Sequence, residues 1–288
     1  MYSMKAIPPV LFPLLSLVGA AKASMPFHDI IHPPGRGSFQ LEVFIDEGDG
    51  NSLKYNVDAP EQRIVSPSSL GLMLEGDVHV GRNVTIEGQS KRKEVRETYR
   101  KFGHHSVATN HHVEVSYSVR HIPTDLSYFV DVRVFHEDGI AFRSRIPGNK
   151  TLLIKGDGTE FRMDFAPTDR AWTYEREDER ADLELKTHTG PSKKTNPAKL
   201  ALRQKGNKAR YGLPMVIEDS SWSVPYPYRA IHEAALFDWE GFHIVALPDA
   251  KGFRTELARV AHPGAPPLLK MSLPLTTSWR VVQIARNL

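Results

Sequence analysis

The sequence predicts an all-β fold, and three observations support this prediction. Runs in which apolar and polar residues alternate recur along the chain, whereas the 3.6-residue period of a helix is nearly absent. Turn-forming residues separate these runs at short intervals, which is typical of large β-sandwiches and barrels. The composition, with 40% hydrophobic and 25% charged residues, is that of an ordinary globular protein. We therefore expect one large β-domain.

The first residues have the features of a secretory signal peptide. Lys5 supplies the positive start, residues 7–20 form an apolar core that prolines interrupt, and residues 21–23 fit the small-x-small cleavage rule. A membrane-spanning helix would need about 20 clean apolar residues. We expect cleavage after Ala23 and a secreted mature domain over residues 24–288, with no membrane segment. Because the chain has no cysteine, a core rather than disulfides must hold this domain together.

Two β-hairpins are predicted. Alternation over residues 39–45, a turn-rich stretch at 47–51 and renewed alternation over 53–57 indicate the first hairpin. The second consists of residues 128–136, a turn at 137–139 that contains an Asp-Gly pair, and residues 140–146. Further strands are expected over residues 112–119, 160–165, 214–218, 242–247 and 279–285.

The charge of the sequence argues against nucleic-acid binding, and it is distributed unevenly along the chain. The formal net charge of +3 is too small to indicate a nucleic-acid partner. Residues 186–210 carry eight basic side chains and no acidic one, and we interpret this stretch as a long solvated surface loop. Asn83 and Asn149 each begin an N-x-Thr triplet, so both are candidate glycosylation sites in a eukaryotic host.

Histidines raise the question of a metal site. Four of them cluster at positions 104, 105, 111 and 112 (His104, His105, His111 and His112). Adjacent residues on a strand point to opposite faces, which separates such ligands, so we favour histidines near a hairpin turn. His232 and Glu233 resemble the start of a zinc-protease helix, but that motif needs a second histidine where Leu236 stands. The zinc-protease hypothesis therefore fails.

Glu233 is the residue whose position most needs an explanation. If residues 230–237 form a strand, then Ile231, Glu233, Ala235 and Phe237 share one face and His232 lies on the other. A carboxylate among apolar neighbours needs a cation or hydrogen-bond donors, because burial without a partner is costly. The simpler alternative is a glutamate at a strand end that reaches water or pairs with an arginine such as Arg229.

Five segments carry a resemblance to a known family, and they follow one another in the family's order: Ser66–Leu72, Glu97–Tyr99 with Asn110–Val115, Val132–Arg143, Ile231–Leu236 and Thr277–Val282. Together they resemble the N-terminal domain of glycoside hydrolase family 97, which contains α-glucosidases and α-galactosidases. The resemblance extends over about residues 39–284, nearly all of the expected mature chain.

The resemblance implies a β-super-sandwich, the galactose-mutarotase-like fold. In the family this domain packs against a (β/α)₈ barrel, which carries the catalytic acid and base and most ligands of a calcium ion. The sandwich contributes one carboxylate to that ion, and by position this residue is Glu233. A barrel needs about 250 further residues, which this sequence does not contain after Leu288. We therefore expect no catalytic residue in this chain and weak or absent calcium binding by the isolated domain.

Three functions remain open. The first is a secreted, carbohydrate-binding-type domain that is not catalytic alone and whose partners are carbohydrate and a separate or truncated barrel. The second is an aldose-epimerase-like enzyme on the same fold, for which His111, His112 and Glu233 are the candidate acid and base. The third is a structural secreted protein without a ligand. A fold does not decide between such functions.

Overall fold

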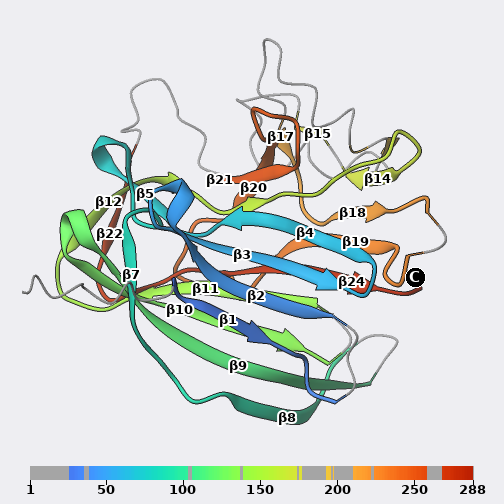
Figure 1. The fold of residues 1–288 in the computed structure, drawn as a ribbon, viewed down its shortest axis with the longest axis horizontal. Coiled ribbons are helices and arrows are strands. Elements are labelled where there is room, and N and C mark those ends of the chain that lie inside the picture. The colour runs from blue at the N-terminus through green and yellow to red at the C-terminus, as the bar shows by residue number, and fades with distance from the viewer. Residues whose placement is uncertain are drawn as a thin grey trace, which may run out of the picture.

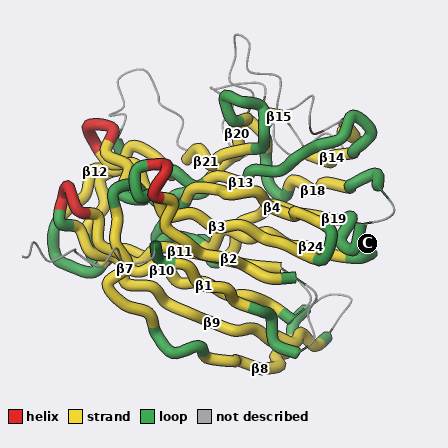
Figure 2. The backbone as a smooth tube through the Cα atoms, in the orientation of Figure 1, coloured by secondary structure: helices red, strands yellow, loops and turns green. Residues whose placement is uncertain are grey.

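The structure, a computed structural model, is built almost entirely of antiparallel strands (Figures 1 and 2). It describes residues 26–35, 39–102, 106–136, 139–173, 175–176, 193–195, 197, 210–221, 224–257 and 268–287. Among these residues there are three short 3₁₀ turns, η1 (Glu47–Asp49), η2 (Glu75–Asp77) and η3 (Ile122–Thr124), and one residue in α-helical conformation, Pro197. None of the helical elements described is long and apolar enough to cross a membrane. The predicted all-β class is confirmed.

The largest element is an eleven-stranded sheet that extends over the whole molecule. Its main path runs, in spatial order, through β16 (Lys193–Thr195), β14 (Arg170–Thr173), β18 (Met215–Glu218), β19 (Tyr228–Ala234), β24 (Trp279–Ala285), β11 (Gly139–Ile146), β10 (Leu126–Phe135), β9 (Val107–His121) and β7 (Val84–Gln89). Beside this path, β23 (Leu275–Thr276) pairs with β11 and β8 (Lys93–Arg100) pairs with β9.

Three smaller sheets complete the fold. The first contains β1 (His28–Ile31), β2 (Gln40–Asp46), β3 (Ser52–Ala59) and β4 (Gln62–Ser69). The second contains β22 (Leu269–Ser272), β12 (Thr151–Asp157), β5 (Leu72–Leu74) and β6 (Val78–His79). The third contains β13 (Glu160–Phe161), β21 (Phe253–Leu257), β20 (Phe242–Ala246), β17 (Arg210–Tyr211) and β15 (Glu175–Arg176).

One core lies between these layers. Figure 1 shows the β1–β4 sheet over the face of β9, β10 and β11. The inward residues of both layers are buried, for example Val43 and Val57 on one side and Val115 and Val134 on the other. The rings of Tyr55 and Phe142 meet across the interface with centroids 4.9 Å apart. Burial of one face in strands such as β2 and β10 is what produces the alternation in the sequence.

Both predicted hairpins are confirmed. The first is formed by β2 and β3, in which Val43 pairs with Tyr55, and its predicted turn contains η1. The second is formed by β10 and β11, in which Val132 pairs with Phe142. The strand expected over residues 279–285 is β24 with the same bounds, whereas the strand expected over 160–165 is shorter and ends at Phe161.

Candidate functional site

Glu233 lies one residue before the end of strand β19. Strand β19 ends at Ala234, and Ala235 turns the chain with a φ of 52°. The predicted strand over residues 230–237 is therefore wrong in its last three residues, because a left-handed residue cannot continue the ladder. Phe237 does not share an apolar face with Glu233, since it is 83% exposed. Ile231 is buried, as expected.

The Glu233 carboxylate is held by donors rather than by a neighbouring arginine on its own strand. It accepts a hydrogen bond of 2.5 Å from the Ser278 hydroxyl and another from the backbone amide of Phe242. Burial raises the pKa of Glu233, although these donors and the Arg280 charge oppose the shift. Arg229, the partner considered from the sequence, pairs instead with Asp219 at 3.3 Å. The Glu233 side chain is thus half-buried and held in place by two hydrogen bonds, and its partial burial disfavours its charged form.

Beside Glu233 lies a buried ion pair. Arg280, which faces Glu233 in the register of β19 and β24, donates from Nε to the Asp157 carboxylate at 2.8 Å and from a second nitrogen to the same oxygen. Asp157 also accepts from the Thr159 amide at 2.9 Å. Both charged side chains are nearly inaccessible to solvent. Because Asp157 already neutralises Arg280, the guanidinium is not a free counter-ion for Glu233.

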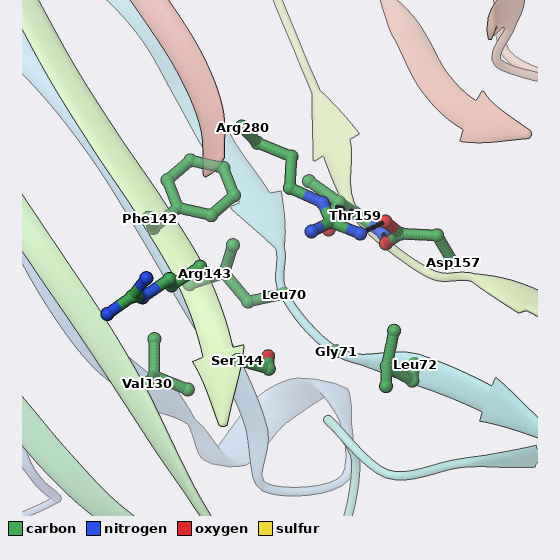
Figure 3. A pocket seen from close by; sticks show the side chains of 10 residues that line it. All are labelled: Leu70, Gly71, Leu72, Val130, Phe142, Arg143, Ser144, Asp157, Thr159 and Arg280. Carbon is green, nitrogen blue, oxygen red and sulfur yellow. Dashed lines mark hydrogen bonds and ion pairs between the residues drawn. The ribbon is translucent and has the colours of Figure 1, made fainter. Parts of the chain in front are cut away.

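A small pocket adjoins this pair (Figure 3). Figure 3 shows the Arg280 guanidinium and the Asp157 carboxylate joined by a hydrogen bond, with Thr159 next to them. The remaining lining comes mainly from apolar core residues and from the backbone of the β4–β5 connection and β11: Leu70, Gly71, Leu72, Val130, Phe142, Arg143 and Ser144. Since the polar groups here already satisfy one another, the pocket offers no evident group for a reaction.

The histidines do not assemble with Glu233. His111 and His112 lie within β9 rather than in a loop, and they point to opposite faces of the sheet as adjacent strand residues must. Four strand spacings, or about 19 Å, separate β9 from β19 along the sheet. His112 is in register with Ala230 and faces away from the side that carries Glu233. The acid–base pairing of an epimerase is therefore not formed by these residues.

His112 has a structural environment of its own. It is buried, its ring packs against Phe135 at 5.3 Å, and one ring nitrogen contacts the Asn110 side chain at 2.8 Å. Burial lowers the pKa of His112. His104 and His105 lie outside the described residues. Within the residues that are described, no cluster of three or more potential metal ligands occurs.

Other sequence predictions fall on the surface or outside the described residues. Asn83 and Asn149 are both exposed, so their positions are compatible with glycosylation, which stays a prediction. The expected signal peptide, residues 1–23, and most of the basic segment 186–210 lie outside the described residues. The exposed Leu236 and Phe237 beside Glu233 were not singled out from the sequence, because an apolar residue in a sequence carries no sign of being exposed.

Comparison with protein families decides the family. A model of the glycosyl-hydrolase 97 N-terminal domain matches residues 35–288, which is nearly the whole chain. The chain belongs to the glycosyl-hydrolase 97 N-terminal family. Among curated proteins none matches the sequence.

Solved structures show the same fold as this glycosyl-hydrolase 97 N-terminal domain. A glycoside hydrolase family 97 enzyme from Pseudoalteromonas sp. strain K8, in complex with acarbose, matches 90% of the chain with a TM-score of 0.71 at 18% sequence identity. A β-arabinopyranosidase matches 90% of it with a TM-score of 0.72 at 16% identity. The chain spans only 36% and 40% of the length of these two proteins. The fold and the predicted N-terminal domain of a family-97 glycoside hydrolase are thus confirmed.

The calcium ion expected from the family can be tested against the donors of this glycosyl-hydrolase 97 N-terminal domain. Calcium prefers 6 to 8 hard oxygen ligands. Glu233 supplies a carboxylate near the end of β19, and Ser278 supplies a hydroxyl beside it. Asp157, the nearby second carboxylate, is engaged by Arg280. The donor set fits one ligand position of a shared site and is too small for a complete site among the residues described.

Proposed function

We propose that this chain is a secreted, carbohydrate-binding-type N-terminal domain of a family-97 glycoside hydrolase, and that it supplies Glu233 as one ligand of a calcium ion shared with a catalytic barrel. The observation that carries the proposal is the half-buried Glu233 carboxylate, fixed by the Ser278 hydroxyl at the end of β19. Family membership, shown over residues 35–288, supports a catalytic domain as the partner.

The surroundings of Glu233 support a docked neighbour. Leu236 is 47% exposed and Phe237 is 83% exposed, directly after the strand that carries the carboxylate. Exposed large apolar side chains at a rim are common where another protein surface binds. A domain that covers these two residues would bring its own oxygen ligands close to Glu233. The calcium ion, when bound, would supply a fixed positive charge, and this chain would contribute the Glu233 carboxylate as one of its ligands.

The purified chain should not hydrolyse nitrophenyl α-glucoside or nitrophenyl α-galactoside. Glycoside hydrolysis usually needs two carboxyl groups placed on either side of the sugar bond. At the proposed site Glu233 is half-buried and bonded to Ser278, while Asp157 is held by Arg280 in a buried ion pair, so no such pair of free carboxyl groups is presented. Release of nitrophenol is the measurement. Turnover that persists after purification and is abolished by Glu233→Gln would contradict the proposal.

Glu233→Gln should leave the free energy of unfolding of the isolated chain unchanged or raise it at pH 7. Burial raises the pKa of Glu233, so folding disfavours its charged form, and the wild type loses stability as the pH rises through the folded-state pKa. A glutamine can still accept the Ser278 hydrogen bond. The gain at pH 7 should therefore disappear below the ordinary glutamate pKa.

Urea unfolding at pH 7 and at pH 3.5 measures this difference, with Asp238→Asn as the control for an exposed carboxylate in the loop after β19. A large loss of stability in Glu233→Gln at pH 7 would show that the glutamate belongs to a structural ion pair.

A further inference from the structure

An exposed ribbon projects from one edge of the large sheet. Strand β8 pairs only with β9 among the described residues and lies off the main path of the sheet. Figures 1 and 2 show it as the outermost strand at the bottom of the view. Seven of its eight side chains are exposed, the exception being Val95. The exposed side chains of β8 do not pack in the core of the described fold. Their residue types can therefore indicate what kind of partner binds this strand.

Basic side chains dominate this ribbon, and among the described residues all but one of them have no acidic partner; the exception is Arg92, which pairs with Asp29 at 2.5 Å. Residues 91–101 contain six basic and two acidic side chains. Lys91, Lys93, Arg96, Arg100 and Lys101 form no ion pair with any described residue, whereas most described arginines elsewhere do, such as Arg63 with Asp58.

The two glutamates of the ribbon are already engaged. Glu94 contacts His111 at 2.7 Å, and Glu97 accepts from Asn110 at 2.6 Å. Together with Asp29, the partner of Arg92, these glutamates give three carboxylates against six basic side chains, so the described ribbon keeps a net positive charge.

Exposed apolar side chains are concentrated at the tip of the same ribbon. Six large hydrophobic residues are exposed in the described structure, and three of them are here: Tyr99 at 55%, Val107 at 56%, and the fully exposed Phe102. Tyr99 is in register with Ala108, and Arg100 with Val107, so the rings stand among the cations. Arg96 and Arg100 share one side of the strand about 13 Å apart, while Lys93 and Tyr99 share the other.

This combination favours a polyanion over a protein partner. The centre of a protein–protein interface is depleted in charge, and lysine is rare there. A row of lysine and arginine side chains along an extended edge instead matches a linear chain of negative charges, as other polyelectrolyte sites do. The exposed rings offer flat apolar faces on which sugar rings can stack.

We propose that the ribbon formed by residues 91–102 and 106–110 binds an anionic polysaccharide, one that carries uronate or sulfate groups. The cations contact the acidic groups, and Tyr99 and Phe102 stack on the sugar rings. The inference rests on the proposed function in one respect, because a domain of a secreted glycoside hydrolase meets polysaccharides rather than nucleic acids. It does not use Glu233 or calcium.

Binding is tested with the whole chain by isothermal titration against polygalacturonate and dextran sulfate, with neutral pullulan as the uncharged probe. Arg96→Gln combined with Arg100→Gln should weaken binding to the charged polymers roughly tenfold, because two counterion-releasing contacts are lost, and the affinity should fall as salt increases. Arg63→Gln, an exposed arginine on β4, is the matched control and should bind like the wild type. Tyr99→Ser with Phe102→Ser should weaken binding while keeping its salt dependence.

Four outcomes would overturn the inference. One is the absence of binding to either charged polymer at low salt. Another is equal loss in Arg63→Gln, which would mean a general charge effect. The third is equal affinity for single-stranded DNA that does not depend on Tyr99 and Phe102. The fourth is a dimer of the chain that dissociates in the Tyr99→Ser, Phe102→Ser variant. None of these outcomes would contradict the calcium proposal, because that proposal is tested separately with Glu233→Gln.

Discussion

Asp157→Ala should lower the free energy of unfolding by about 3–5 kcal/mol, because it leaves the buried Arg280 guanidinium without its counter-charge. Both side chains are 2% exposed, and Asp157 receives two hydrogen bonds from Arg280 and one from the Thr159 amide. After this change the Arg280 guanidinium keeps its hydrogen bond to the Ser278 carbonyl oxygen but has lost both bonds to a carboxylate. Removing one member of the ion pair should therefore lower stability strongly, even though the intact pair need not make the fold more stable than two apolar residues would.

A matched control is the ion pair of Lys155 with Asp77, in which both side chains are largely exposed. Asp77→Ala should change stability by no more than about 1 kcal/mol, since exposed pairs contribute little. Urea unfolding curves of both variants give the comparison. A loss in Asp157→Ala as small as that in Asp77→Ala would mean that water reaches Arg280 and that this end of the sandwich is open.

Gly139→Ala should destabilise the fold by about 3 kcal/mol or more, which combines backbone strain with a clash. Gly139 begins β11 with a φ of 120°, a conformation that residues with a Cβ rarely adopt. An added Cβ would lie 2.1 Å from the Val282 carbonyl oxygen on β24, and neither strand can move without breaking the ladder.

Gly156→Ala is the control for Gly139→Ala, because its added Cβ would meet nothing within 4 Å and its φ is ordinary. Its unfolding free energy should stay within about 1 kcal/mol of the wild type. If the two alanine variants melt at the same temperature, the close approach of β11 and β24 at Gly139 does not exist in solution.

The fold was predictable because both layers of the sandwich bury alternate residues. In β2 and β10 this burial is largely regular, so the period of two appears directly in the sequence, whereas β3 has buried residues on both of its faces. Strand β8 carries no such period, because nearly all its side chains are exposed, and β5 and β6 are too short to show one. These segments become strands because they pair with other strands of the fold, and the local alternation of residues cannot reveal that pairing.

The candidate site was only partly predictable. The resemblance of its segment to the family made Glu233 a candidate ligand, which stays a prediction, whereas its strand was wrongly expected to continue past Ala234. The alanine-rich stretch that follows gives no turn signal, so the left-handed Ala235 could not be foreseen. The pairing of Asp157 with Arg280 joins residues 123 positions apart, and only the packing of β12 against β24 brings them together.

The central claim is that Glu233 completes a calcium site that this chain cannot form alone. The most direct measurement is calcium titration by calorimetry of the chain alone and of the chain mixed with a separately expressed family-97 catalytic domain, with wild type, Glu233→Gln and Asp238→Asn compared. The account predicts weak or undetectable binding by the chain alone, and in the complex an affinity that falls roughly tenfold or more in Glu233→Gln but not in Asp238→Asn, because one charged ligand is lost. Tight calcium binding by the isolated chain, or a complex whose affinity is the same with Glu233→Gln, would contradict it.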